Sequence, residues 1–334
     1  MTILLLVLTG VLSVVSLFIG VINLNVGDIL GGDWSQMEIL LASRLPRLLA
    51  ILCTGVGMSV AGLLMQQLCM NKFVSPSTGA TISSAQFGIL ISMLFLPGAG
   101  LAGKTIFAFA AAVAGTWIFV LFIQSIKFKD IVMVPLVGIM FSSIIMGATN
   151  YLAYKYNLMQ ALTSWLVGDF SLIIRGRYEI VFLVVPMVVI AFVFANHFNI
   201  VGMGEDFSKN LGVNYNLVLF GGLSIAALIT ASVVVTVGSI PYLGLIIPNL
   251  VAMFKGDKIR GSLIDIALFG ALFVLACDIL GRVVNYPYEI PINLTTGVFG
   301  SLVFLALLLQ RLSPGGRRRA RRMAPKACGK SEVI

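Results

Sequence analysis

Long apolar runs alternate with short polar breaks along most of the chain. A helix needs roughly 20 apolar residues to cross a bilayer. Lipid offers the backbone no hydrogen-bond partners, so runs this apolar have to be helical. The pattern therefore predicts ten spans, of which the eighth is short and contains two prolines, at approximately residues 2–23, 46–68, 78–96, 103–126, 131–153, 178–197, 215–237, 240–254, 262–284 and 291–310.

A polar island, Gly204–Gly212, separates the sixth run from the seventh. Its charged residues, Glu205, Asp206 and Lys209, are too costly to leave in hydrocarbon, so we expect the island to lie in water or against another protein. Its length suits about two turns of a helix capped by glycine. The island is either a simple connector or a handle on which an outside protein pushes.

The composition supports a membrane protein, because 59% of the residues are hydrophobic and 10% are charged, whereas a soluble domain carries about 25% charged residues. We expect an all-α polytopic membrane protein with one transmembrane domain over 1–312 and a basic, disordered cytoplasmic tail over 313–334. The net charge of +9 does not indicate nucleic-acid binding. The basic residues flank the spans and fill the tail, where membrane topology and anionic lipid explain them.

The distribution of lysine and arginine predicts that both termini are cytoplasmic. With that orientation, 15 basic residues fall inside and 7 outside, and without the tail the numbers are 7 and 7, so the tail decides the orientation. The island is then cytoplasmic, and segments 24–45 and 154–177 are external. The first run has no basic start and no A-x-A site, so we expect it to be a retained span.

The sequence shows little catalytic or metal-binding chemistry of its own. It has no C-x-x-C pair, no mid-span cluster of ionisable residues and no G-x-x-x-x-G-K-[ST] phosphate loop. We interpret the four cysteines and the single histidine as structural residues: Cys53, Cys69, Cys277, Cys328 and His197. If the protein transports actively, its energy has to come from a separate subunit.

Several motifs, in order and with characteristic separations, resemble the iron–siderophore and vitamin B12 permease family of bacterial ABC importers, the FecCD type. The resemblance extends over about residues 40–310. It rests on the island and on these stretches: Arg44-Leu45-Pro46-Arg47, Gly62-Leu63-Leu64-Met65-Gln66, Asn71-Lys72-Phe73, Gly238-Ser239-Ile240-Pro241, Gly244-Leu245-Ile246-Ile247-Pro248, Asp278-Ile279-Leu280-Gly281-Arg282, Pro291-Ile292 and Gly297.

The resemblance implies one half of a dimeric pore in the bacterial cytoplasmic membrane, paired with a second copy or a related permease. Two cytoplasmic ATP-binding cassette ATPases would use ATP and Mg, and an external substrate-binding protein would deliver a ferric siderophore. The chain itself would be non-catalytic and would bind no cofactor or metal.

The resemblance also assigns roles to three arginines. Arg44, Arg47 and Arg282 match family arginines that contact acidic residues on the binding protein. The planar guanidinium suits this role because it binds carboxylates through two hydrogen bonds. The alternative is that these side chains only extend from span ends to the membrane interface.

The island matches the family pattern G-[DE]-x-x-A-x-x-L-G, with Ser208 where alanine is usual. In the family this segment forms a helix that seats in a cleft of the ATPase and transmits its motion as a rigid body. The resemblance therefore assigns ATPase coupling to Gly204, Glu205, Asp206, Leu211 and Gly212.

Two further stretches are assigned by resemblance. Asn71 and Phe73 match a cytoplasmic gate, although Lys72 replaces the usual proline. Trp165 and Asp169 lie in a stretch that resembles the family's W-[LM]-x-G segment near the external cavity, with Asp169 where many relatives carry a small residue. A second departure is Asn249, which stands where the family often has histidine.

Other functions stay open at this stage. The cargo could be haem or a cobalamin, and the partner permease could be identical or different. An ion-coupled secondary transporter belongs to another class and would need buried ionisable residues for coupling. A membrane-embedded enzyme is disfavoured, because no paired carboxylates or nucleophile–base arrangement is present.

Overall fold

In the computed structural model the described residues are 1–20, 34–98, 100–126, 132–174, 176, 178–255 and 259–312. Across these ranges the regular structure is helical, apart from an isolated bridge between Val167 and Ser239. The prediction of an all-α fold is thereby confirmed. The predicted tail, 313–334, lies outside the described residues.

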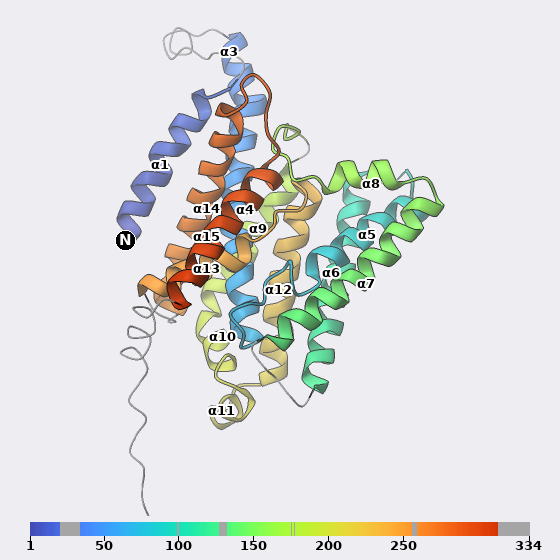
Figure 1. The fold of residues 1–334 in the computed structure, drawn as a ribbon, viewed down its shortest axis with the longest axis vertical. Helices are drawn as coiled ribbons and strands as arrows, with labels where there is room; N and C mark the ends of the chain where they lie inside the picture. Colours follow the sequence, from blue (N-terminus) through green and yellow to red (C-terminus); the bar gives the residue numbers. More distant parts are fainter. Residues whose placement is uncertain are drawn as a thin grey trace, which may run out of the picture.

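Figure 1 shows the arrangement of these helices. In chain order they are α1 (Thr2–Phe18), α3 (Trp34–Ile39), a π-helical turn (Leu40–Arg44), α4 (Leu45–Leu68), α5 (Thr81–Phe95), α6 (Leu101–Ser125), α7 (Met133–Lys155), α8 (Met159–Leu166), a 3₁₀ turn (Glu179–Leu183), α9 (Val184–Val193), α10 (Ala195–Val201), α11 (Glu205–Asn210), α12 (Tyr215–Thr236), α13 (Leu243–Lys255), α14 (Ile259–Val283) and α15 (Ile292–Leu312).

Every predicted span overlaps a helix, but the helices differ in length. Five described helices are long and apolar enough to cross a membrane, or six if the bent pair over Glu179–Val201 is one span. The predicted span over 178–197 falls on this pair, in which the chain bends by 64° between Val193 and Ala195. The shorter apolar helices are α1, α5, α13 and the start of α15, so length and hydropathy alone leave the number of spans at five or six among the described residues.

α4 is the central helix, packed against α12, α13 and α14 (Figure 1). Its small residues allow the backbones to approach closely. A Cβ atom on Gly55 would lie 2.6 Å from the Cα atom of Ala271 in α14. One on Gly62 would lie 2.0 Å from the carbonyl oxygen of Gly244 in α13. The glycines that the sequence shows in this run are therefore required by helix packing.

α1 lies on the outside of this core along α14, and polar contacts hold it at both ends. Near its start, the Thr2 hydroxyl donates to the fully buried carboxylate of Asp265 at 2.6 Å, and Lys255 forms an ion pair with the same carboxylate. Past its end, Arg282 donates to the carbonyl of Ile19 at 2.8 Å. The buried charges of α14, Asp265 and Arg282, thus fix the position of the first helix.

The two ends of the helical body differ. α11 lies at the lower end in Figure 1, whereas α3 and α8 lie at the upper end. The predicted coupling residues and the predicted docking residues are consequently at opposite ends of the molecule.

The contact between α4 and α13 makes a stability prediction. Gly62→Ala forces a methyl group into the Gly244 backbone, and such overpacking costs about 1–3 kcal/mol. Gly221→Ala is the matched control, because its Cβ would meet nothing within 4 Å. Thermal unfolding of the purified chain in detergent should show a lowered Tm for Gly62→Ala alone; equal Tm values for the two variants would contradict the packing assignment.

Candidate functional site

A network of buried charges lies at the α3 end of the molecule. The Arg47 guanidinium donates to Asp278 Oδ1 from Nη2 at 2.8 Å and from Nε at 3.3 Å. Its Nη1 donates to Glu289 Oε2 at 2.7 Å. Asp278 sits in α14 and Glu289 in the segment between α14 and α15, so Arg47 joins α4 to both.

Arg282, the third arginine that the resemblance assigns to docking, lies deeper than the other two. Its side chain is only 2% exposed. One helical turn away, Asp278 forms an ion pair with it at 2.5 Å. Its Nη1 donates to the carbonyl oxygens of Ser16 at 2.9 Å and Ile19 at 2.8 Å. In this conformation Arg282 holds the end of α1 beside Asp278.

Arg44 lies nearer the surface. It is half-buried, donates to the carbonyl of Ile19, and lines a hollow of about 640 Å³ together with Arg47, Glu38 and Glu289. The structure thus brings Arg44 and Arg47 together at one surface. The sequence analysis missed Glu289 and the pairing of Asp278, although the four-residue spacing of Asp278 and Arg282 was a usable signal for an ion pair.

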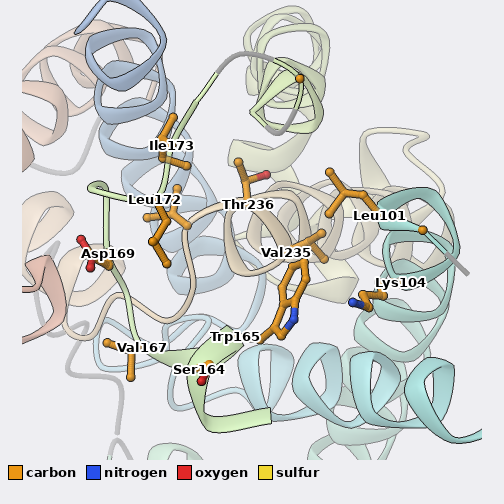
Figure 2. A pocket seen from close by; sticks show the side chains of 13 residues that line it. Leu101, Lys104, Ser164, Trp165, Val167, Asp169, Leu172, Ile173, Val235 and Thr236 are labelled. Atoms are coloured by element: carbon orange, nitrogen blue, oxygen red, sulfur yellow. The ribbon is translucent and has the colours of Figure 1, made fainter. Parts of the chain in front are cut away.

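Trp165 and Asp169 line one cavity of about 570 Å³, near the α8 end (Figure 2). The Lys104 ammonium lies 4.2 Å from the centre of the Trp165 ring, a cation–π contact. Figure 2 shows Lys104 and Trp165 on one side of the cavity and Asp169 on another. The Asp169 carboxylate accepts hydrogen bonds from the Ser171 amide at 2.8 Å and the Ser171 hydroxyl at 2.7 Å. Lys104 was not predicted.

Backbone contacts explain why this stretch sits where it does. The amide of Asp169 donates to the Val237 carbonyl at 3.0 Å, and the amide of Asn293 donates to the Gly168 carbonyl at 3.2 Å. A Cβ atom on Gly168 would lie 2.5 Å from the Ser239 carbonyl oxygen. A larger residue at Gly168 would therefore separate the cavity wall from the chain that supports it.

A second cavity, of about 330 Å³, lies among α4, α10, α13 and α14, and Asn71 lines it. Asn71 is buried, and its side-chain oxygen accepts from the Phe73 amide at 2.9 Å. The Asn249 amide donates to the Lys72 carbonyl at 2.9 Å and to the Leu245 carbonyl at 2.7 Å. The two departures from the family pattern, at Lys72 and Asn249, thus meet in space. Phe73 is half-buried in the same turn and is not among the residues that line the cavity.

The polar island forms α11, bounded by glycines in the positive-φ region that other residues rarely adopt: Gly204 at φ +112° and Gly212 at +73°. At its end the Val213 amide donates to the Ser208 carbonyl at 2.9 Å, and the Gly212 amide donates to the Lys209 carbonyl at 3.0 Å. This pair of bonds is a Schellman C-cap. The predicted short capped helix is therefore present.

One side of α11 is buried and the other is free for a partner. Ser208 is fully buried, and its hydroxyl donates to the Gly204 carbonyl at 2.8 Å. Glu205 and Asp206 are exposed, and the Leu211 side chain is 55% exposed. Glu205 pairs with Lys209 at 2.8 Å, and this hydrogen bond raises the pKa of the Lys209 ammonium.

Comparison with known proteins defines the class. The chain resembles a solved inward-facing structure described as a metal-chelate type ABC transporter, with a TM-score of 0.80 and 26% identity, over 92% of this chain and 98% of that chain. The model of the FecCD transport family matches residues 5–310. The protein belongs to the FecCD transport family.

Curated relatives agree with this membership. The petrobactin import system permease protein YclN of Bacillus subtilis (strain 168) is 48% identical over 91% of this chain and 96% of its own length. The ferric-anguibactin transport system permease protein FatD of Vibrio anguillarum is 38% identical over 81% of this chain and 86% of its own length. The resemblance inferred from sequence motifs is confirmed.

The charge network makes a prediction that separates its members. Asp278→Asn leaves the buried Arg282 without its matching charge and leaves Arg47 with Glu289 alone. Breaking a buried ion pair in this way costs about 3–5 kcal/mol. Glu289→Gln removes a partly exposed partner, for which the loss is about 0–1 kcal/mol. Thermal unfolding in detergent should therefore rank Asp278→Asn far below Glu289→Gln. A reversed or equal ranking would show that Asp278 does not hold the network.

Proposed function

We propose that this chain is the membrane-spanning subunit of an ATP-driven importer that moves a ferric siderophore across the bacterial cytoplasmic membrane. The observation that carries the proposal is the 48% identity, over nearly the full length of both chains, to a petrobactin import permease. The anguibactin relative supports the same class of cargo, an iron chelate.

The proposed topology has ten spans with both termini cytoplasmic. It is supported by the helix found at each predicted range and by the bias of basic residues toward one side. The shorter helices α1, α5, α13 and α15 then complete the six spans that length and hydropathy support. In this topology α11 faces the cytoplasm, and the α3 end, with Arg44 and Arg47, faces outward.

Two permease subunits are proposed to form the pore, as a homodimer or with a related chain. α7 supports this arrangement, because an apolar helix with only 22% of its span buried within the chain has to face lipid or another subunit. The chelate would pass along the subunit interface, beside the cavity that Trp165 and Asp169 line.

Transport is proposed to occur by alternating access. A loaded external binding protein presents carboxylates to Arg44 and Arg47. ATP binding by two cytoplasmic ATPases, which use Mg and are the catalytic subunits, moves α11 as a rigid body through contacts of Gly204, Glu205, Asp206, Leu211 and Gly212. The turn with Asn71 and Phe73 opens and closes the cytoplasmic exit. This chain supplies the path and binds no cofactor.

Reconstituted transport tests the function. Proteoliposomes that contain this chain, its ATPase and the partner permease should accumulate radioactive iron from ferric petrobactin when ATP and the binding protein are present. Replacing ATP by a non-hydrolysable analogue should abolish uptake. Uptake driven by a proton or sodium gradient without ATP would favour a secondary transporter, and uptake of haem or cobalamin in place of the siderophore would change the cargo.

The coupling role of α11 has its own test. Replacing Glu205 and Asp206 by alanine and Leu211 by aspartate should reduce ATPase stimulation by the loaded binding protein at least about tenfold, because a rigid contact that transmits motion is lost. The control is Glu179→Ala, which removes an exposed acidic residue outside α11.

Membrane insertion should be normal in both variants of this pair, as measured by yield and by size-exclusion chromatography. Normal stimulation and import by the α11 variant would refute the coupling role.

A further inference from the structure

We propose that Glu289 competes for Arg47 with a carboxylate of the docking protein. In this proposal the incoming carboxylate displaces Glu289 from Arg47, and the exchange changes the external cavity. The inference deepens the proposed function and rests on it, because it requires a protein that docks on the hollow beside Arg44 and Arg47. It assigns a specific role to an acidic side chain that lines this hollow together with the two arginines.

Arg47 is occupied before any partner arrives. Its Nε and Nη2 donors face Asp278 at 3.3 and 2.8 Å, and its Nη1 donor faces Glu289 at 2.7 Å. A guanidinium binds a carboxylate most strongly through two adjacent donors. Both accessible edges of the Arg47 guanidinium already bind a carboxylate oxygen. An incoming carboxylate can therefore bind through two donors only after Asp278 or Glu289 has moved away.

Burial decides which resident leaves. The Asp278 side chain is 3% exposed and also pairs with Arg282. Separating Asp278 from Arg47 would therefore leave buried charges without a partner. The Glu289 side chain is 26% exposed and borders the hollow. Exposed ion pairs contribute little and exchange readily. Glu289 is therefore the exchangeable partner, and Asp278 is the fixed one.

The charges in the hollow balance as long as Glu289 pairs with Arg47, and they fit an acidic partner once Glu289 is displaced. Arg44 and Arg47 line it together with Glu38 and Glu289, and the buried Arg282 and Asp278 lie just beneath. Displacing Glu289 exposes the Arg47 donors beside Arg44, which creates two adjacent cationic groups. The occupant that the hollow takes is a carboxylate side chain of the external binding protein.

The backbone connects Glu289 to the cavity. The next residue, Ile290, donates through its amide to the Gly281 carbonyl at 3.0 Å, which fixes the segment to the end of α14. At the start of α15, the Asn293 amide donates to the Gly168 carbonyl at 3.2 Å. Gly168 lies between Val167 and Asp169, which line the cavity. Release of Glu289 thus loosens a short segment whose other end holds the cavity wall.

The test compares two variants that remove the same charge from the same hollow. Glu289→Gln removes the competitor of Arg47, whereas Glu38→Gln removes a carboxylate that lines the hollow on α3. Both should speed association to a similar degree by improving the charge match. Glu289→Gln should in addition slow dissociation, giving a Kd about two- to fivefold below that of Glu38→Gln.

The measurement uses the complete importer in nanodiscs and the purified, loaded binding protein, with association and dissociation followed by biolayer interferometry. A second readout is the labelling rate of a cysteine at Ser164, which lines the cavity. Without binding protein, Glu289→Gln should speed this labelling and Glu38→Gln should not. A purely structural role of Glu289 would not tighten docking.

The outcomes separate the inference from the function it rests on. Equal Kd values for the two variants would overturn the competition, and so would weaker docking by a Glu289→Gln variant whose Tm equals that of the wild type. If Arg44→Glu still abolishes docking in either case, the docking surface itself is unaffected by this result. Unchanged Ser164 labelling overturns the link to the cavity. If the wild-type importer binds no external protein, the proposed function itself fails at the docking step.

Discussion

The position of one carboxylate, Asp278, organises the α3 end of the molecule. Two arginines share it, Arg47 from α4 and Arg282 from its own helix, and Arg282 in turn holds the end of α1. In a place with little water, such charges are tolerated only when each is matched. The need to match these charges therefore holds α1, α4 and α14 in one arrangement. The sequence of no single helix shows this requirement.

The opposite end follows a different constraint. α11 is held through its buried Ser208 and its two glycines, while its acidic residues and Leu211 face outward. A short helix fixed by its caps moves as one piece, so a push on its exposed side reaches α10 and α12, which it contacts. One end of the molecule thus has a rigidly attached helix, α11. The other end has a charge network in which one pair, Arg47 with Glu289, can exchange. This combination suits a protein that transmits motion along its length.

The sequence predicted the helices well, because lipid forces apolar runs into one regular structure. It also predicted that the eighth span, α13, is short. It could not predict the 64° bend after Val193 or that α1 is short, since these depend on packing. It also grouped Arg282 with the surface arginines, because a motif specifies order along the chain and not depth. The pairing of Arg47 with Glu289 joins residues 242 positions apart, and the contact of Lys104 with Trp165 joins α6 to α8. No periodicity encodes contacts of that range.

Departures from a family pattern can be understood once their neighbours are known. Lys72 lacks the fixed φ that proline imposes, which on its own implies a looser turn at the predicted gate. The Asn249 amide, itself at a position of departure, donates to the Lys72 carbonyl and also to Leu245 within its own helix. The turn is therefore restrained by a hydrogen bond to α13, and this restraint involves two positions at which the sequence departs from the family pattern.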